Sequence, residues 1–424
     1  MTRTIPGALG GLSSDGWLLF VTRFIRLFAY GSLSVILVFY LVSLGLSESQ
    51  TGLLLSLTLA GDVVVSLFLT TRADRIGRRH MLIVGAALMA GAGLAFALSH
   101  NFLFLVIAGT IGVISPSGNE VGPFLSIEQA ALSHVVSAET RTAVFAWYTL
   151  AGSVATALGA LGGGTITHVL QQNAVTAVNS YRVMVFAYAA LGLVLLFLFL
   201  RLTPAAEVSN AHLPSARDLK TFFGVHRSHR VVLKLSSLFA LDSFAGGFVI
   251  QSFAAYWFYL RFGVNPGTLG AIFFCANLFA GISALLASWI ASRIGLVKTM
   301  VYTHLPSNVL LIFVPLMPTL KLAIAVLLLR FSISQMDVPT RQSYTMAVVS
   351  PEERSAAAGI TGVARTTGAA ISPLFAGLLF ARPSLINIPF YLAGALKIVY
   401  DLALYSAFVR VQPAKDASVQ SARL

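Results

Sequence analysis

Among the charged side chains inside long apolar stretches of this sequence, six are candidates for transport chemistry: Arg26, Asp62, Glu120, Asp242, Asp337 and Arg365. A charge at the centre of a bilayer costs about 2.5–3.5 kcal/mol on insertion scales, and such residues usually pair with one another or mark the path of a solute or a proton. Arg23 and Arg26 are one helical turn apart and therefore share a face. We expect these groups to bind a solute or a proton, with structural ion pairing as the alternative.

Two of the carboxylates stand close to a proline, in Asn-Glu-Val-Gly-Pro at 119–123 and in Asp-Val-Pro at 337–339. Proline breaks the hydrogen-bond ladder of a helix, which is tolerated at membrane depth where protein or a cavity satisfies the freed carbonyls. We therefore expect helix breaks there, with Glu120 and Asp337 as buried carboxylates suited to carrying a proton. Nearer the helix ends, salt bridges between helices are expected from Glu128, Arg141, Arg341 and Arg354.

Polar and aromatic side chains in the same stretches are candidates for lining a cavity: Trp147, Tyr148, Gln251, Tyr256, Trp257 and Asn277. Packing or anchoring at the membrane interface is the alternative for the aromatic ones. The single cysteine, Cys275, allows no intrachain disulfide, and His212, His226 and His229 lack the spacing of metal ligands. No metal or other cofactor is expected.

The elements that hold these residues are expected to be membrane-spanning helices. Of 424 residues, 57% are apolar and 10% are charged, against about 25% charged in soluble chains. A span takes ~20 mostly apolar residues. Twelve runs qualify, near 17–43, 51–70, 81–99, 102–125, 143–168, 181–201, 231–260, 268–291, 299–317, 321–346, 356–380 and 386–409. The sequence predicts an all-α membrane protein with twelve transmembrane helices, the first of them retained and not cleaved as a signal peptide.

The basic residues are divided unevenly between the alternating loops. One set of loops, with the chain ends, holds most of the 28 lysines and arginines, whereas the opposite set holds little beyond Arg182, Arg261, Lys321 and Arg382. The positive-inside rule therefore predicts that both termini are cytoplasmic. The net charge of +13 is explained by this topology and by the anionic inner leaflet of the bilayer, and no nucleic-acid partner is expected.

The two halves of the chain are repeats. A shift of 218 residues places 73–77 over 291–295 and Gly52 over Gly270, and a shift of 213 residues aligns 129–141 with 342–354. A polar stretch separates the halves. We expect an N-terminal six-helix bundle at 1–201, a cytoplasmic linker at 202–229, and a C-terminal six-helix bundle with its tail at 230–424.

This six-plus-six repeat resembles the major facilitator superfamily of membrane transporters. Its loop signature between helices 2 and 3 is matched at Asp74, Arg75, Gly77, Arg78 and Arg79, with Thr70 in place of the leading glycine. Its antiporter signature is present in weakened form on helix 5 at Gly159, Gly163 and Gly164, and more closely on helix 11 at Gly359, Gly368, Pro373 and Gly377. The resemblance implies two pseudo-symmetric bundles, a loop that latches the cytoplasmic side through Asp74, and a monomer.

The resemblance implies secondary transport by alternating access around a midplane site. Small residues on helices 5 and 11 favour proton-coupled efflux of a toxic or drug-like solute across the inner or plasma membrane, although plain packing also explains them. Proton-coupled uptake of a small metabolite stays open, as does efflux of an anionic or metalloid species bound by Arg26 and Arg365. Drug/proton antiporters of the family usually carry an arginine early in helix 4, which this chain lacks at 103–110; only Arg330 on helix 10 is comparable.

A membrane-embedded enzyme and a non-transporting receptor or scaffold are two further classes of membrane protein. The chain has no HExxH, nucleophile elbow or GxxxxGK[ST] motif, so we expect no enzyme activity. A receptor or scaffold on the same fold remains as an alternative, but it would tolerate loss of the inward polar residues, and this chain has kept them. The expected partners are a small solute, protons and the lipid bilayer.

Overall fold

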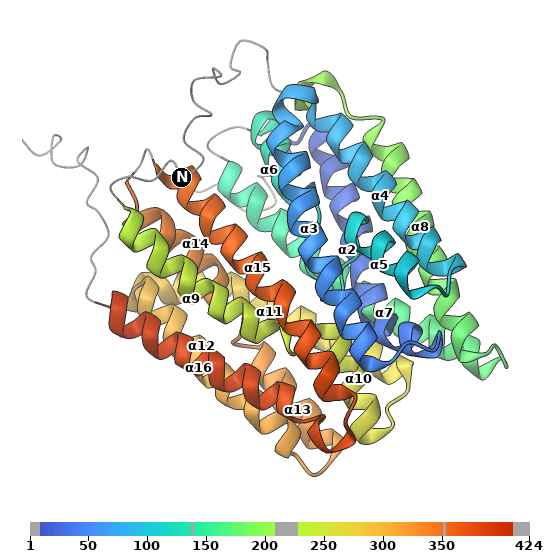
Figure 1. The fold of residues 1–424 in the computed structure, drawn as a ribbon. Coiled ribbons are helices and arrows are strands. Elements are labelled where there is room, and N and C mark those ends of the chain that lie inside the picture. The colour runs from blue at the N-terminus through green and yellow to red at the C-terminus, as the bar shows by residue number, and fades with distance from the viewer. Residues whose placement is uncertain (1–8, 137–139, 208–227, 351–352, 410–424) are drawn as a thin grey trace, which may run out of the picture. The chain divides into compact units, whose positions relative to one another are not determined.

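The computed structural model describes residues 9–136, 140–207, 228–350 and 353–409. Every regular element in these ranges is a helix (Figure 1). The first six predicted spans are formed by α2 (Ser14–Ser43), α3 (Glu48–Ile76), α4 (Arg78–Leu98), α5 (Phe102–Ile111) with α6 (Phe124–Val135), α7 (Arg141–Gln172) and α8 (Ala177–Phe199). The other six are formed by α9 (His229–Gly247) with α10 (Gln251–Phe262), α11 (Pro266–Ile294), α12 (Leu296–Phe313), α13 (Leu320–Phe331) with α14 (Asp337–Val348), α15 (Arg354–Phe380) and α16 (Ile388–Phe408). Short 3-10 turns are η1 (Pro204–Ala206), η4 (Val314–Leu316) and η6 (Pro383–Leu385).

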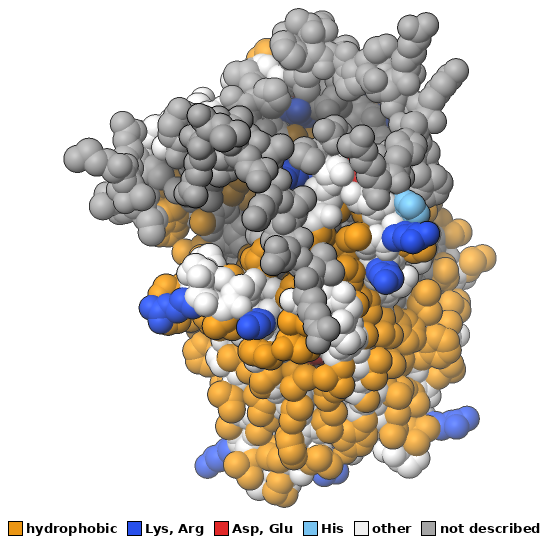
Figure 2. Space-filling view, turned by 90° about the vertical axis from the view of Figure 1, so that its left-hand side faces the viewer, with side chains coloured by type: hydrophobic (Ala, Val, Ile, Leu, Met, Phe, Trp, Pro, Cys, Tyr) orange, Lys and Arg blue, Asp and Glu red, His pale blue; other side chains and the backbone are white. Residues whose placement is uncertain are grey.

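Length and composition qualify 10 of these helical stretches to cross a membrane. The other two spans are the predicted helices 4 and 10, each of which is broken into two shorter pieces. The predicted all-α fold with twelve transmembrane helices is confirmed. Apolar side chains cover the outside of many helices, among them Phe68, Leu103 and Phe197. Figure 2 shows a broad apolar area on one face, with Lys and Arg side chains above and below it.

The breaks in helices 4 and 10 confirm the prediction from the proline-containing segments. Between α5 and α6 the chain passes through Gly118 and Gly122, whose φ angles of 72° and 79° lie in the left-handed region that suits glycine. Asp337 begins α14, and Pro339 stands in its first turn, where backbone N–H groups lack helical partners and proline costs little. A third break, between α9 and α10, was not predicted from the continuous apolar run 231–260. It follows the pair Gly246–Gly247.

The described chain forms two compact units. Unit 1 holds the first six spans together with Phe248–Gly281 and Ala370–Pro389, and unit 2 holds α9, α11 from Ile282, α12 to α14, α15 up to Ala369, and α16 from Phe390. Most of the expected linker lies outside the described residues. The division into bundles at 1–201 and 230–424 stays a prediction.

In unit 1, α2 is the central helix and is buried along its whole length from Ala29 to Leu41. It packs on α7 and α8, and α4 lies along α8 (Figure 1). A Cβ on Gly31 would collide with the backbone of Thr156, and one on Gly159 would collide with the backbone of Phe28. The absence of side chains at these glycines is what lets α2 and α7 approach so closely.

Two further close contacts in unit 1 join segments from the two halves of the sequence. Gly164 on α7 meets the backbone of Gly270 on α11, and Gly377 on α15 meets the backbone of Gly52 on α3. The two contacts are equivalent under the sequence repeat, which places Gly52 over Gly270 and Gly164 over Gly377. Each predicted small-residue signature thus contributes one glycine to a symmetric pair of helix crossings.

Unit 2 has its own core, in which α9, α12, α14 and α16 contribute Phe239, Met300, Tyr344 and Tyr400. Gly368 on α15 meets the backbone of Ala240 on α9. Gly359, from the same predicted signature, is exposed and has no atom within 4 Å of the position that a Cβ would take.

Candidate functional site

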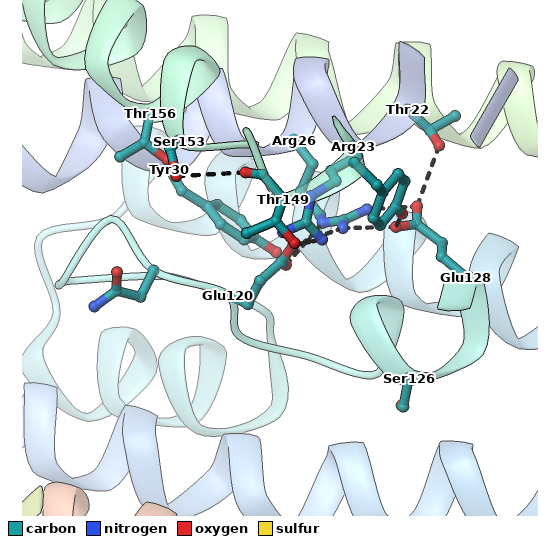
Figure 3. A network of polar contacts seen from close by, with 12 residues as sticks. Thr22, Arg23, Arg26, Tyr30, Glu120, Ser126, Glu128, Thr149, Ser153 and Thr156 are labelled. Atoms are coloured by element: carbon teal, nitrogen blue, oxygen red, sulfur yellow. Dashed lines mark hydrogen bonds and ion pairs between the residues drawn. The ribbon is translucent and has the colours of Figure 1, made fainter. Parts of the chain in front are cut away.

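A buried charge network in unit 1 is centred on Arg26 of α2. Arg26 donates two hydrogen bonds to Glu128, of 2.6 and 2.8 Å, and two to Glu120, of 3.1 and 3.3 Å (Figure 3). Arg23 forms a 2.7 Å ion pair with Glu120. The side chains of Arg26 and Glu128 are both fully buried. The network therefore balances two arginines with two carboxylates inside the membrane domain.

Neutral groups complete the coordination of these carboxylates. Thr22 donates a 3.1 Å hydrogen bond to Glu128, and the Tyr148 hydroxyl donates another. The guanidinium of Arg26 lies 4.6 Å from the centre of the Phe124 ring, and that of Arg23 lies 4.4 Å from the ring of Tyr148. A network with its lone pairs satisfied in this way is rigid, and removal of one member is costly.

The helix break positions the two carboxylates. Glu120 lies in the irregular segment between α5 and α6, whereas Glu128 is on α6. In one continuous helix, residues eight apart would lie two turns apart, about 12 Å along the axis. Because the chain turns between them, both carboxylates reach the same guanidinium (Figure 3).

Asp62 on α3 is tied to the same break. Its Oδ1 accepts a 2.5 Å hydrogen bond from the backbone N–H of Gly122 and a 3.2 Å bond from Ser66. Asp62 is half-buried, and within the described residues it has no ion pair. Since Arg23 and Arg26 are already balanced by two glutamates, Asp62 is the uncompensated negative charge of this region.

A second charge network lies in unit 2 around Asp242 of α9. Asp242 accepts a 2.5 Å bond from Lys397 on α16 and a 3.1 Å bond from Arg341 on α14, and Nε2 of His304 lies 3.7 Å away. Arg341 also pairs with Asp337 at 3.0 Å. All of these side chains are buried.

His304 continues this network to Asp401. Its Nδ1 lies 2.8 Å from Oδ1 of Asp401, and Asn308 donates a 2.9 Å hydrogen bond to Oδ2. Sequence reasoning missed His304, Asn308, Lys397 and Asp401. The available signal was that each pair lies four residues apart in a predicted span, at 304 and 308 and at 397 and 401.

The other predicted charges have different environments. Arg365 on α15 is half-buried, and no hydrogen bond or ion pair is found for it among the described residues. Arg330 on α13 lies over the Phe331 ring, 4.9 Å from its centre. The expected inter-helix salt bridges are confirmed for Glu128 and Arg341. Arg141 and Arg354 also donate to backbone carbonyls, those of Ser133 and Met346.

Five of the six candidates for cavity lining form polar contacts inside unit 1. Gln251 donates to Ser34 at 2.7 Å and accepts from Asn277 at 3.1 Å. Tyr256 donates to Glu48 at 2.8 Å. Trp257 donates to Asn387 at 2.9 Å, and Tyr148 belongs to the network around Arg26. The contacts of Gln251 with Ser34 and of Tyr256 with Glu48 connect helices from the two halves of the sequence.

The predicted loop signature joins α3 to α4 at Gly77, whose φ is 115°. The backbone N–H groups of Arg78 and Arg79 donate to the carboxylate of Glu207, at 2.7 and 3.0 Å. Glu207 therefore caps the positive N-terminal end of α4. Arg75 is exposed. The Asp74 side chain lies outside the described residues, so its expected latch contact is not tested.

Sequence comparison finds a family and a full-length relative. The profile of the Major Facilitator Superfamily matches residues 19–334 and 252–423. The uncharacterized membrane protein YJR124C of Saccharomyces cerevisiae is 31% identical over 426 residues, covering 94% of this chain and 95% of that protein. The quinolone resistance protein NorA of Staphylococcus aureus is 30% identical over 99 residues, covering 23% of this chain and 26% of NorA.

Structure comparison finds transporters with the same fold. A bacterial homolog of the human lysosomal transporter Spinster matches with a TM-score of 0.73 and 14% identity, covering 95% of this chain and 98% of that one. The nucleoside transporter NupG matches with a TM-score of 0.70 and 14% identity, covering 93% and 99%. At this level of identity the likeness concerns the fold.

Proposed function

The chain belongs to the Major Facilitator Superfamily, and from that premise we propose that it exports a toxic or drug-like solute in exchange for protons. Its family and its fold are those of a secondary transporter and not of an enzyme. Members of this fold bind small solutes and work by alternating access. The direction, the class of solute and the coupling to protons are what we propose.

The observation that carries the proposal is the environment of Asp62. This carboxylate lies in a membrane span, is half-buried, and accepts hydrogen bonds only from Gly122 and Ser66 among the described residues. A lone negative charge in such a place attracts either a proton or a cationic solute, and the two compete for it. Because the proton and the solute compete for the same carboxylate, binding of one releases the other, which is what an exchanger requires.

Protonation of Asp62 has a structural consequence. A carboxylate accepts the hydrogen bond from the Gly122 N–H far better than a neutral carboxyl does. Gly122 belongs to the break that also carries Glu120. Proton binding at Asp62 therefore loosens the segment that positions Glu120 against Arg23 and Arg26.

The similarity to NorA supports drug-like export over uptake, because the matched relative is named for quinolone resistance. The match is limited to 99 residues. The small-residue crossings of α7 and α15 are consistent with the antiporter signature that the sequence contains.

Export of an anion is a second candidate, favoured by Arg365. The other arginine considered for an anionic solute, Arg26, is held by Glu120 and Glu128. Arg365 has no such carboxylate partner among the described residues. A solute with a negative charge would supply one.

A survival screen followed by a flux assay tests the proposal. A strain that overexpresses the protein is challenged with antibiotics, dyes and metalloids, and the compound with the largest gain in survival becomes the probe in proteoliposomes with an imposed pH gradient. We expect gradient-driven movement of that compound, and its loss in Asp62→Asn. The matched control is Ser126→Ala on α6, an exposed side chain of the same unit. Full gradient-driven flux in Asp62→Asn would contradict the role of this carboxylate.

We also propose the location and topology that the loop charges predict: a multi-pass protein of the inner or plasma membrane, monomeric, with both termini in the cytoplasm. The halves at 1–201 and 230–424 are proposed as the two bodies that alternate.

A further inference from the structure

A buried histidine of unit 2 lies between two carboxylates from different helices. His304 is on α12, Asp401 is on α16 and Asp242 is on α9. Nδ1 of His304 is 2.8 Å from Asp401, and Nε2 is 3.7 Å from Asp242. His304 is 4% exposed and Asp401 is 0% exposed. Each ring nitrogen thus faces a carboxylate away from bulk water.

His304 is in contact with Asp401 and the ring of Tyr400 from α16, with Asn308 from α12 itself and with Asp242 from α9. Asp242 brings further charges into the same network, because Lys397 from α16 and Arg341 from α14 pair with it, and Arg341 also pairs with Asp337. Arg330 from α13 and Arg365 from α15 interact electrostatically with Asp242 and Asp337.

Two cations of this network, Lys397 and Arg341, are engaged in ion pairs. Lys397 and Arg341 form ion pairs with Asp242, and Arg341 with Asp337. The described residues place His304 alone at ion-pair distance from Asp401, whose other contact is the neutral amide of Asn308. A fully buried carboxylate without a cation is strongly disfavoured. The pair of His304 and Asp401 therefore needs one proton, held on either partner, to be neutral.

We propose that His304 and Asp401 together form a second, exchangeable proton-binding site, in addition to Asp62. The inference rests on the proposed coupling of transport to protons. On release, an N–H or O–H bond of the pair breaks and the proton passes to water, leaving a neutral imidazole beside an ionised Asp401.

Loss of this proton changes the ion pairs around α9. Lys397 and Asp401 are four residues apart on α16 and so lie on one helix face. When Asp401 becomes an uncompensated anion, it draws Lys397 away from Asp242. Asp242 on α9 then depends on Arg341 of α14 alone. The proton site thereby controls how α16 is joined to α9.

The direct test is a proton count on the purified full-length protein, which requires no solute. Acid–base back-titration is carried out over about pH 5 to 10, the range in which histidine and lysine titrate. The variant is His304→Gln combined with Asp401→Asn, which removes the pair and leaves in place the residues of three ion pairs: Lys397 with Asp242, Arg341 with Asp242, and Arg341 with Asp337. The control is Ser237→Ala, an exposed side chain of the same unit that has no titratable group in this range.

We expect the wild type to bind one more proton than the double variant over part of this range. A difference curve that stays at zero throughout would overturn the proposal, because it would mean that the proton is fixed. If the double variant does not fold, as judged by size-exclusion chromatography, His304→Gln alone is used. In that variant the proton must sit on Asp401, so the one-proton step must move along the pH axis, and an unmoved step contradicts the site.

This test is separate from that of the proposed function. If no solute moves under a pH gradient in the wild type but the one-proton step is present, the transport proposal fails and the site stands. If Asp62→Asn abolishes flux but the step is absent, the transport proposal stands and the second site fails.

Discussion

Single buried charges are held in place by partners that come from distant parts of the chain. The sequence singled out Arg26, Glu120, Asp242 and Asp337, and the structure places all of them in two ion-pair networks. The partners His304, Lys397 and Asp401 were missed, because their importance comes from contacts between α9, α12 and α16. Residue type and depth in a span are visible in a sequence, whereas pairing across 97 or 155 positions is not.

The Glu128→Gln substitution, which removes one buried charge, is predicted to destabilise the protein. Glu128 is fully buried and carries the shortest contact of Arg26, at 2.6 Å. Breaking a buried ion pair costs about 3–5 kcal/mol, and the expected result is a clearly lower Tm of the detergent-purified protein. Ser126→Ala, exposed on the same helix, is the control. Equal melting temperatures for the two variants would show that Glu120 alone compensates Arg26.

Hydropathy and local motifs predicted most of the observed helices and most of the breaks within them. The twelve spans were predicted from apolar runs, and the breaks at Glu120 and Asp337 from adjacent prolines. The break between α9 and α10 was not predicted, because the apolar run is continuous there. A backbone contact explains it: the N–H of Ser252 donates to the carbonyl of Pro116 at 3.2 Å, whereas in a continuous helix it would donate to the carbonyl four residues earlier.

Helix crossings provide a matched pair of glycines for a test. Gly377→Ala would place a Cβ against the backbone of Gly52 and Glu48, and overpacking of this kind costs about 1–3 kcal/mol. Gly359→Ala on the same helix meets nothing, and alanine favours a helix over glycine by up to about 1 kcal/mol. Thermal unfolding should show a lower Tm for the first variant only. A lower Tm for both variants would mean that the glycines stabilise the protein through the flexibility of α15 and not through the close helix crossing.

The first turn of α4 should be stabilised by Glu207, a residue that is not part of the loop signature. Glu207→Gln removes the negative charge that accepts from Arg78 and Arg79, and helix caps of this kind contribute about 1 kcal/mol. Hydrogen exchange of the first amides of α4 should become faster, while Arg201→Ala, an exposed change nearby, should leave it unaltered. Unchanged hydrogen exchange in Glu207→Gln would show that groups other than the Glu207 carboxylate cap the N-terminal end of α4.

The whole molecule is a duplicated transporter fold, and the duplication is visible in contacts as well as in sequence. Arg141 and Arg354, aligned by the repeat, each donate to the carbonyl eight residues before them. The glycine pairs 164 with 270 and 377 with 52 are likewise equivalent. A sequence repeat predicted the symmetry of the fold, but it could not predict that Phe248–Gly281 and Ala370–Pro389 pack with the first half in one compact unit.

The side of the membrane on which each loop lies can be measured with single cysteines. Cys275 is first replaced by serine, and Arg293→Cys, in the last turn of α11, and Arg382→Cys, after α15, are introduced separately at two exposed positions on opposite predicted sides of the membrane. A membrane-impermeant maleimide added to intact cells should label the second variant only. Labelling of Arg293→Cys alone would place the termini outside the cell.

Exchange of solute for protons is the central claim, and a proton measurement in proteoliposomes tests it most directly. The vesicles contain the solute identified by the survival screen together with a pH-sensitive dye, and they are diluted into solute-free buffer of the same pH. Outward movement of solute is predicted to draw protons inwards and acidify the interior, with no change in vesicles that carry Asp62→Asn. An interior that becomes alkaline would show that protons leave with the solute, and an unchanged interior would show that they do not move at all; either result contradicts proton-coupled export.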